Sequence, residues 1–139
     1  MSLSIRNQLS GTVTASTPGE VMAMVKIRLT GGQNLTAAIT REAAEELGLA
    51  AGTAVQALVK STEVSLATAP VDGLSIRNQL PGMISDIATG GAMAAVRISV
   101  EGADLIAVIT KDAVTDLGLT TGIPVVALIK STEVSLATV

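Results

Sequence analysis

The heptapeptide LSIRNQL occurs at residues 3–9 and again, unchanged, at residues 74–80. The nonapeptide KSTEVSLAT occurs at residues 60–68 and again, unchanged, at residues 130–138. The sequence between these two motifs is similar in the two copies but not identical. A recent duplication alone would spread the identity evenly, so its concentration at both ends indicates that the ends share a task.

The internal repeat predicts two domains. Self-similarity at a fixed period is typical of chains built from copies of one structural unit. We predict a first domain at residues 1–68 and a second domain at residues 74–139. The linker between them, residues 69–73, reads APVDG and is too short to let the two domains move far apart.

Hydrophobic periodicity predicts the same order of elements in each copy. Residues 21–30 alternate between apolar and polar side chains, which is typical of a half-buried strand. Gly11 lies inside the preceding strand and predicts a bulge or a sharp bend there. Thr40 is a suitable N-cap for a helix, and Gly48 is a suitable stop for it. The elements expected in the first copy are strands at 4–16, 21–30 and 35–39, a helix at 41–47, and strands at 55–59 and 63–67.

The position of the helix, between the third and fourth strands, is that of the OB-fold barrel. The predicted fold class is therefore all-β, with two tandem OB-fold-like five-stranded barrels and one short helix in each. The chain has no Phe, Tyr, Trp or Cys, so its core must be aliphatic and no disulfide can stabilise it. The five Met residues are interpreted as core filler rather than as a copper site. A domain of about 66 residues is marginally stable alone, so we expect packing against the twin copy and against other chains.

The composition excludes several classes of function. Without His and Cys the chain lacks the commonest transition-metal ligands and the usual general base. Only 15% of the residues are charged, the net charge is −3, and no basic run is present, so neither nucleic acid nor a membrane is an expected partner. The N-terminal residues do not resemble a signal peptide. We therefore expect a cytoplasmic protein that is not an enzyme.

The basic residues indicate an anion site. Eight of the nine Lys and Arg residues fall at corresponding positions of the two copies, and two of these pairs, Arg6 with Arg77 and Lys60 with Lys130, lie inside the unchanged motifs. Ser and Thr hydroxyls flank these cations, and an oxyanion needs donors of both kinds. Equally, the same side chains could cap strand ends and pair with surface carboxylates. The Glu of each KSTEV segment would repel a dianion unless it points away.

These motifs resemble those of the Mop domain, which binds molybdate. SIRNQL at residues 4–9 is similar to the opening of that domain. AIT at residues 38–40 and LVKSTEV at residues 58–64 are similar to its middle and its close. The likeness covers both copies, so the chain resembles the molbindins, which are tandem Mop-domain proteins of the ModG type.

The resemblance implies an OB-like barrel in each copy and a homotrimer that holds molybdate, or tungstate as its analogue, at domain and subunit interfaces. It also implies a part in intracellular molybdenum storage and homeostasis, and no site for a free metal cation. Other Mop-domain proteins carry a helix-turn-helix or a Walker motif, and neither is expected here. The positions that match the oxyanion-binding residues are Ser4, Arg6, Asn7, Thr40, Lys60 and Ser61 in the first copy and Ser75, Arg77, Asn78, Thr110, Lys130 and Ser131 in the second.

Three other functions stay open at this point. Sulfate and phosphate are tetrahedral oxyanions like molybdate, and residue types alone do not separate the three ligands. An OB-fold can also bind nucleic acid, although it does so with aromatic platforms and a basic groove. The repeats could instead be a purely structural assembly module.

Overall fold

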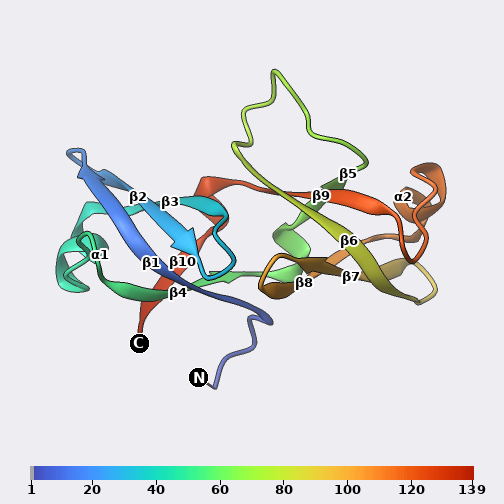
Figure 1. Cartoon of the computed structure of the whole chain (residues 1–139), viewed down its shortest axis with the longest axis horizontal. Helices are drawn as coiled ribbons and strands as arrows, with labels where there is room; N and C mark the ends of the chain where they lie inside the picture. Colours follow the sequence, from blue (N-terminus) through green and yellow to red (C-terminus); the bar gives the residue numbers. More distant parts are fainter. Residues whose placement is uncertain (1) are drawn as a thin grey trace.

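The computed structural model describes residues 2–139, which form ten β-strands, two short α-helices and two 3-10 turns. The strands build two five-stranded sheets that lie side by side along the long axis of the molecule (Figure 1). Within this part of the chain no helix has the length and apolar character needed to cross a membrane.

The elements of the first repeat are β1 (Asn7–Pro18), β2 (Met22–Leu29), β3 (Asn34–Thr40), α1 (Arg41–Glu46), β4 (Ala54–Val59), η1 (Ser61–Glu63) and β5 (Ser65–Ala67). Those of the second are β6 (Asn78–Thr89), β7 (Met93–Val100), β8 (Ala103–Thr110), α2 (Lys111–Asp116), β9 (Pro124–Ile129), η2 (Ser131–Glu133) and β10 (Ser135–Thr138).

The predicted fold class is confirmed, and so are the strand alternation and the helix cap and stop from which it was predicted. Exposed and buried side chains alternate strictly along β2, as its sequence period requires. Thr40 caps α1, because its Oγ1 accepts a hydrogen bond from the Ala43 N–H at 3.1 Å. Gly48 ends the helical turn with a φ of +62°. The fifth strand is shorter than predicted, because the residues before it form the 3-10 turn η1.

The fifth strands are exchanged between the repeats. β10, from the second repeat, pairs antiparallel with β4 of the first, and Leu136 lies opposite Ala57. β5, from the first repeat, pairs with β9 of the second, and Leu66 lies opposite Ala127. Figure 1 shows both crossings between the two halves of the molecule. The linker at residues 69–73 divides the sequence repeats, whereas each barrel is completed by a strand from the other side of that linker.

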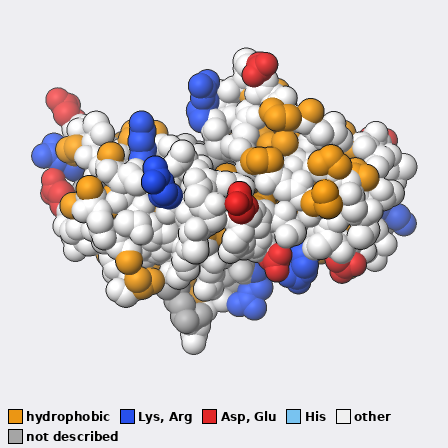
Figure 2. All heavy atoms as spheres, viewed as in Figure 1, with side chains coloured by type: hydrophobic (Ala, Val, Ile, Leu, Met, Phe, Trp, Pro, Cys, Tyr) orange, Lys and Arg blue, Asp and Glu red, His pale blue; other side chains and the backbone are white. Residues whose placement is uncertain are grey.

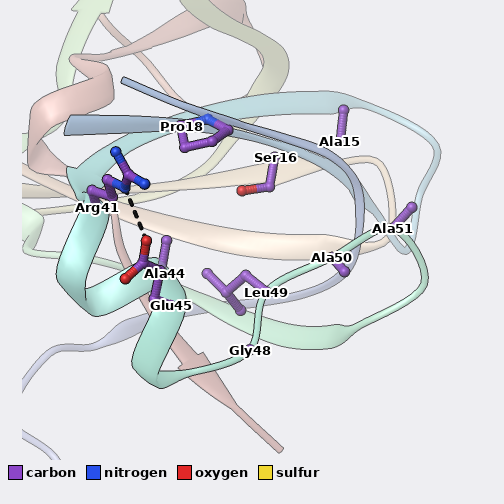
Figure 3. Close-up of a pocket in the computed structure, with 10 residues that line it drawn as sticks. All are labelled: Ala15, Ser16, Pro18, Arg41, Ala44, Glu45, Gly48, Leu49, Ala50 and Ala51. Carbon is purple, nitrogen blue, oxygen red and sulfur yellow. Dashed lines mark hydrogen bonds and ion pairs between the residues drawn. The ribbon is translucent and has the colours of Figure 1, made fainter. Parts of the chain in front are cut away.

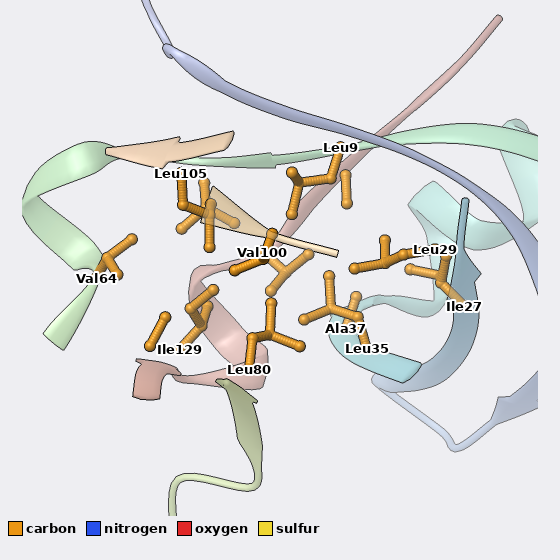
Figure 4. Close-up of a cluster of buried hydrophobic side chains, with 14 of the residues drawn as sticks. Leu9, Ile27, Leu29, Leu35, Ala37, Val64, Leu80, Val100, Leu105 and Ile129 are labelled. Atoms are coloured by element: carbon orange, nitrogen blue, oxygen red, sulfur yellow. The ribbon is translucent and has the colours of Figure 1, made fainter. Parts of the chain in front are cut away.

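The two sheets share one aliphatic core. Leu9 and Ile27 of the first repeat and Leu80 and Ile129 of the second belong to one buried cluster, and each is 2% exposed or less. Figure 4 shows these side chains gathered with their neighbours between the sheets. Because the core is continuous and the strands are exchanged, we expect the two repeats to unfold together.

Two glycines allow close backbone approaches that no other residue would permit. The turn between β2 and β3 touches the turn between β7 and β8, and a Cβ atom at Gly31 would overlap the carbonyl oxygen of Glu101. In β1, a Cβ atom at Gly11 would lie 2.6 Å from Cγ2 of Ile27. The register of β1 against β2 shifts just beyond Gly11, so the predicted bulge is present.

The interpretation of the Met residues as core filler is wrong for the four that the structure describes; Met1 lies outside the described residues. These four side chains are 41–50% exposed. They are Met22, Met24, Met83 and Met93. Those on β2 and β7 occupy outward positions of alternating strands, whose inward positions hold Ala, Val, Ile and Leu.

Because β10 belongs to the first sheet, a mutation in this last strand of the second repeat should destabilise the first sheet. Leu136 of β10 packs against the core, so Leu136→Ala should lower the free energy of unfolding by about 2 kcal/mol. Hydrogen-exchange mass spectrometry should show the largest loss of amide protection in β4. The matched variant Leu66→Ala in β5 should instead deprotect β9. Loss of protection in β9 but not β4 for Leu136→Ala would contradict the exchange.

Candidate anion-binding site

Antiparallel pairing brings the two motifs of each repeat together. β1 pairs with β4 so that Asn7 faces Val59. Arg6 immediately precedes this pair and Lys60 immediately follows it, so both cations lie at the same end of neighbouring strands. The second repeat has the same register, and its corresponding residues are Asn78, Ile129, Arg77 and Lys130. The structure therefore joins the two motifs into one cluster per repeat, as the anion-site prediction requires.

The Asn residues of these clusters are buried and bind the backbone of the opposite repeat. Asn7 Nδ2 donates to the Ile106 carbonyl oxygen at 2.9 Å, and Asn7 Oδ1 accepts from the Ile106 N–H at 2.8 Å. Asn78 makes the same pair of hydrogen bonds with Thr36, at 2.8 and 2.9 Å. Each side-chain amide thus takes the place of a neighbouring strand along β8 or β3. These hydrogen bonds hold the two repeats together.

The four cations of the motifs have no carboxylate partner within residues 2–139. Arg6 is exposed, and its Nη2 donates to the Leu3 carbonyl oxygen at 2.7 Å. The single ion pair in this part of the chain joins Arg41 Nε to Glu45 Oε1 at 2.9 Å. The alternative prediction, that the motif cations pair with surface carboxylates, therefore finds no support, and their charge is available to an anion.

The hydroxyl groups beside the cations lie at two depths. Ser4 and Ser75 are exposed and precede the first strand of their repeat. Ser61 and Ser131 are half-buried and open the turns η1 and η2. These turns pack against β8 and β3, the third strands of the opposite repeats. Asn78 Nδ2 also reaches Ser131 Oγ at 3.4 Å. Each cluster therefore combines both motifs of one repeat with a wall from the other.

A small pocket beside Lys60 is lined by residues of both repeats, as the strand exchange requires. Its volume is about 140 Å³. The lining residues are Ile5, Leu58 and Lys60 of the first repeat and Thr132, Glu133 and Ser135 of the second. Glu133 and Lys60 line the same pocket without forming an ion pair, so this pocket holds groups of both charges.

The structure does not bring Thr40 to the cluster of its own sheet. Thr40 faces Met22 at the end of the sheet that carries α1, whereas Asn7 lies at the far end of β1. Its hydroxyl is occupied as the N-cap of α1. Thr110 occupies the same position at the start of α2 and accepts from the Ala113 N–H at 3.1 Å. Thr40 and Thr110 therefore lie too far from the cations of their own sheet to share an anion with them, unless a group from outside that sheet completes the site.

A groove of about 510 Å³ beside α1 is a packing gap rather than a second anion site (Figure 3). Its lining is mainly apolar, and its one cation, Arg41, is held by Glu45. The second repeat carries Ile87 and Val114 where the first repeat has Ser16 and Ala44. Both larger side chains pack against the core.

The residues found in the second repeat provide a test of whether the groove beside α1 is a packing gap. The double variant Ser16→Ile with Ala44→Val copies the second repeat into the groove and should raise the free energy of unfolding by about 1 kcal/mol. The reverse change, Ile87→Ser with Val114→Ala, should lower it by about 2 kcal/mol or more. Chemical denaturation measures both. A destabilised Ser16→Ile, Ala44→Val variant would show that the groove is not an unfilled equivalent of the second repeat.

The charges on the displayed face are mixed in sign. Figure 2 shows Lys and Arg side chains interspersed with Asp and Glu on the displayed face, without a continuous basic stripe. Single-strand binding by an OB-fold uses aromatic platforms, and the chain has no aromatic residue. Among the described residues, no three His, Cys, Asp or Glu side chains gather as a cation site would need. The two Arg–Lys clusters are therefore the candidate anion sites considered below.

Comparison with known proteins identifies the same repeats. The family profile of the TOBE domain matches residues 3–66 and 74–136. The "Molybdenum transport protein ModE" of Azotobacter vinelandii is 41% identical over 138 residues, which is 99% of this chain and 51% of that protein. The "Molybdenum-pterin-binding protein MopA" of Rhodobacter capsulatus is 40% identical over 139 residues, which is 99% of this chain and 52% of that protein. The chain thus spans about half the length of the curated relatives it matches.

A solved structure matches the whole chain. It is a crystal form of the cytoplasmic molybdate-binding protein ModG with molybdate bound. The two chains superpose with a TM-score of 0.96 at 42% identity, and the match covers 100% of both. At this TM-score and coverage the likeness extends to the arrangement of the two repeats.

Proposed function

The chain belongs to the TOBE domain family as a tandem pair of Mop repeats, and on that premise we propose that it binds molybdate, with tungstate as a close analogue. The observation that carries the proposal is the Arg–Lys pair in each repeat, which has no carboxylate partner in an ion pair within residues 2–139. The molybdate-bound ModG crystal form, which matches the full length, supports the choice of ligand.

The chemistry of each cluster suits a tetrahedral dianion. One Arg and one Lys balance its two negative charges, and the guanidinium offers several donors in a fixed fork. The Ser hydroxyls and nearby backbone N–H groups add neutral donors. Hydrogen bonds in which the donor or the acceptor is charged are the strong ones, so Arg6 and Arg77 should dominate the affinity. The chain would then hold the anion without transforming it.

Sites completed between copies of the chain explain the separation of Thr40 from Arg6. In this proposal the chain forms a homotrimer, and molybdate lies at domain and subunit interfaces where Thr40 or Thr110 of one copy can approach a cluster of another. Binding that requires the assembled state also stabilises it. Sedimentation equilibrium should give three times the chain mass of 13.9 kDa; a monomer that binds molybdate with full affinity would contradict interface sites.

The biological role that fits is storage and buffering of molybdenum in the cytoplasm, where ModG itself is described. A second role is favoured by the length of the curated relatives, since the same sites could be the sensing half of a longer regulator or transport protein. The mass of the endogenous protein separates the two roles. A band near 13.9 kDa supports storage by the free tandem pair, and a band about twice as large supports a sensing half.

Removal of the two Arg side chains tests the site assignment. Arg6→Ala with Arg77→Ala should weaken molybdate binding by about ten- to a hundredfold, the equivalent of one charged hydrogen-bonding group per site. Isothermal titration with molybdate, tungstate, sulfate and phosphate measures the affinity and the selectivity. The matched control, Lys26→Ala with Arg97→Ala, removes the paired cations of β2 and β7 and should leave binding within about twofold. Unchanged binding in the Arg6, Arg77 variant would refute the site, and equal affinity for sulfate would refute molybdate as the ligand.

A further inference from the structure

The linker between the repeats is held against the second anion cluster by the side chain of Gln79. Gln79 Oε1 accepts from the Val71 N–H at 3.0 Å. Gln79 Nε2 donates to the Val71 carbonyl oxygen at 2.8 Å and to the Ile76 carbonyl oxygen at 3.2 Å. The side-chain amide therefore pairs with the linker as a strand neighbour would. Figure 1 shows this segment projecting from the molecule between β5 and β6.

The same motif position in the first repeat has different surroundings. Gln8 Nε2 donates to the Ile5 carbonyl oxygen at 3.1 Å, which corresponds to the bond between Gln79 and Ile76. Gln8 lies instead against a cavity of about 330 Å³ between the repeats, lined among others by Gly31 and Glu101. Two identical motifs are thus placed in two environments, and only the second carries the linker.

The linker held by Gln79 and the cation of the second cluster line one pocket. A polar pocket of about 250 Å³ is lined by Val71, Asp72, Gly73, Leu74, Arg77 and Gln79. Asp72 and Arg77 share this pocket without forming an ion pair, since the single ion pair within residues 2–139 lies at Arg41. An oxyanion that binds Arg77 therefore enters a pocket that Asp72 also lines, whereas residues 2–5, which precede Arg6, include no acid. The Glu of the KSTEV segment is common to both repeats, so it does not distinguish the two sites.

We propose that the linker makes the two oxyanion sites unequal, with Asp72 lowering the affinity of the Arg77 site below that of the Arg6 site. This inference rests on the proposed function. Gln79 is the positioning residue, because its hydrogen bonds to Val71 hold Asp72 at the wall of the pocket. Both groups are exposed to water, so the repulsion is moderate and screened by salt. The Arg6 sites fill first as molybdate rises, and the Arg77 sites act as a lower-affinity reserve.

The test is isothermal titration of the full chain with sodium molybdate at low ionic strength. The wild-type protein should show two classes of site that differ by about three- to tenfold, the scale of one screened charge contact. Arg6→Ala should remove the tighter class and Arg77→Ala the weaker class. Asp72→Asn should tighten the weaker class until the two nearly merge. Raising the salt concentration should narrow the wild-type difference.

Matched variants separate the linker from general charge effects. Glu20→Gln, in the exposed β1–β2 turn, makes the same change of net charge and should leave two classes of site. Gln79→Ala, which frees the linker, should tighten the weaker class, whereas Gln8→Ala should not. A single class of site in the wild type, or equal curves for Asp72→Asn and Glu20→Gln, overturns the inference and leaves molybdate binding intact. Absence of any molybdate binding by the wild type overturns the proposed function and this inference with it.

Discussion

The exchange of the fifth strands is the constraint on which the rest of the structure depends. β10 completes the first sheet and β5 completes the second, so neither sheet is whole without the other repeat. The turns η1 and η2, which lead into these strands, carry the Ser of each anion cluster and pack against the opposite repeat. The same crossing that joins the barrels therefore builds the walls of both Arg–Lys clusters.

Two buried amides reinforce the crossing. Asn7 and Asn78 each form a reciprocal pair of hydrogen bonds with the backbone of the opposite third strand. A buried amide without partners would cost about 1–3 kcal/mol, so these pairs also specify how the repeats meet. The identity of the motif in the two copies consequently has two proposed physical causes: the cations would bind an anion, and the Asn residues join the two repeats. The amino-acid sequence of the motif alone does not distinguish these two causes.

Sequence reasoning reached the fold because its signals are local. Alternation in β2, the cap at Thr40 and the stop at Gly48 each depend on a few neighbouring residues. The strand exchange carries no such signal, because β5 and β10 have the same sequence over SLA and would fit either sheet. The exposure of Met22 and Met24 follows from the same alternation, since both residues share the face of Lys26 and Arg28, so the core-filler interpretation overlooked a local signal. The repeat predicts the candidate site cations, whereas Thr36 and Ile106 bind the Asn side chains through backbone atoms that any residue supplies. Gln79 and Asp72 were missed because only the fold brings the linker to Arg77.

The central claim is that molybdate binds where the two motifs of each repeat meet. Anomalous diffraction at the molybdenum absorption edge, from crystals grown with molybdate, tests this claim most directly. The account predicts one anomalous peak beside each Arg–Lys cluster, within hydrogen-bonding distance of Arg6 and of Arg77. Peaks confined to the groove beside Arg41 or to the cavity at Gly31, with none at the Arg–Lys clusters, would contradict it.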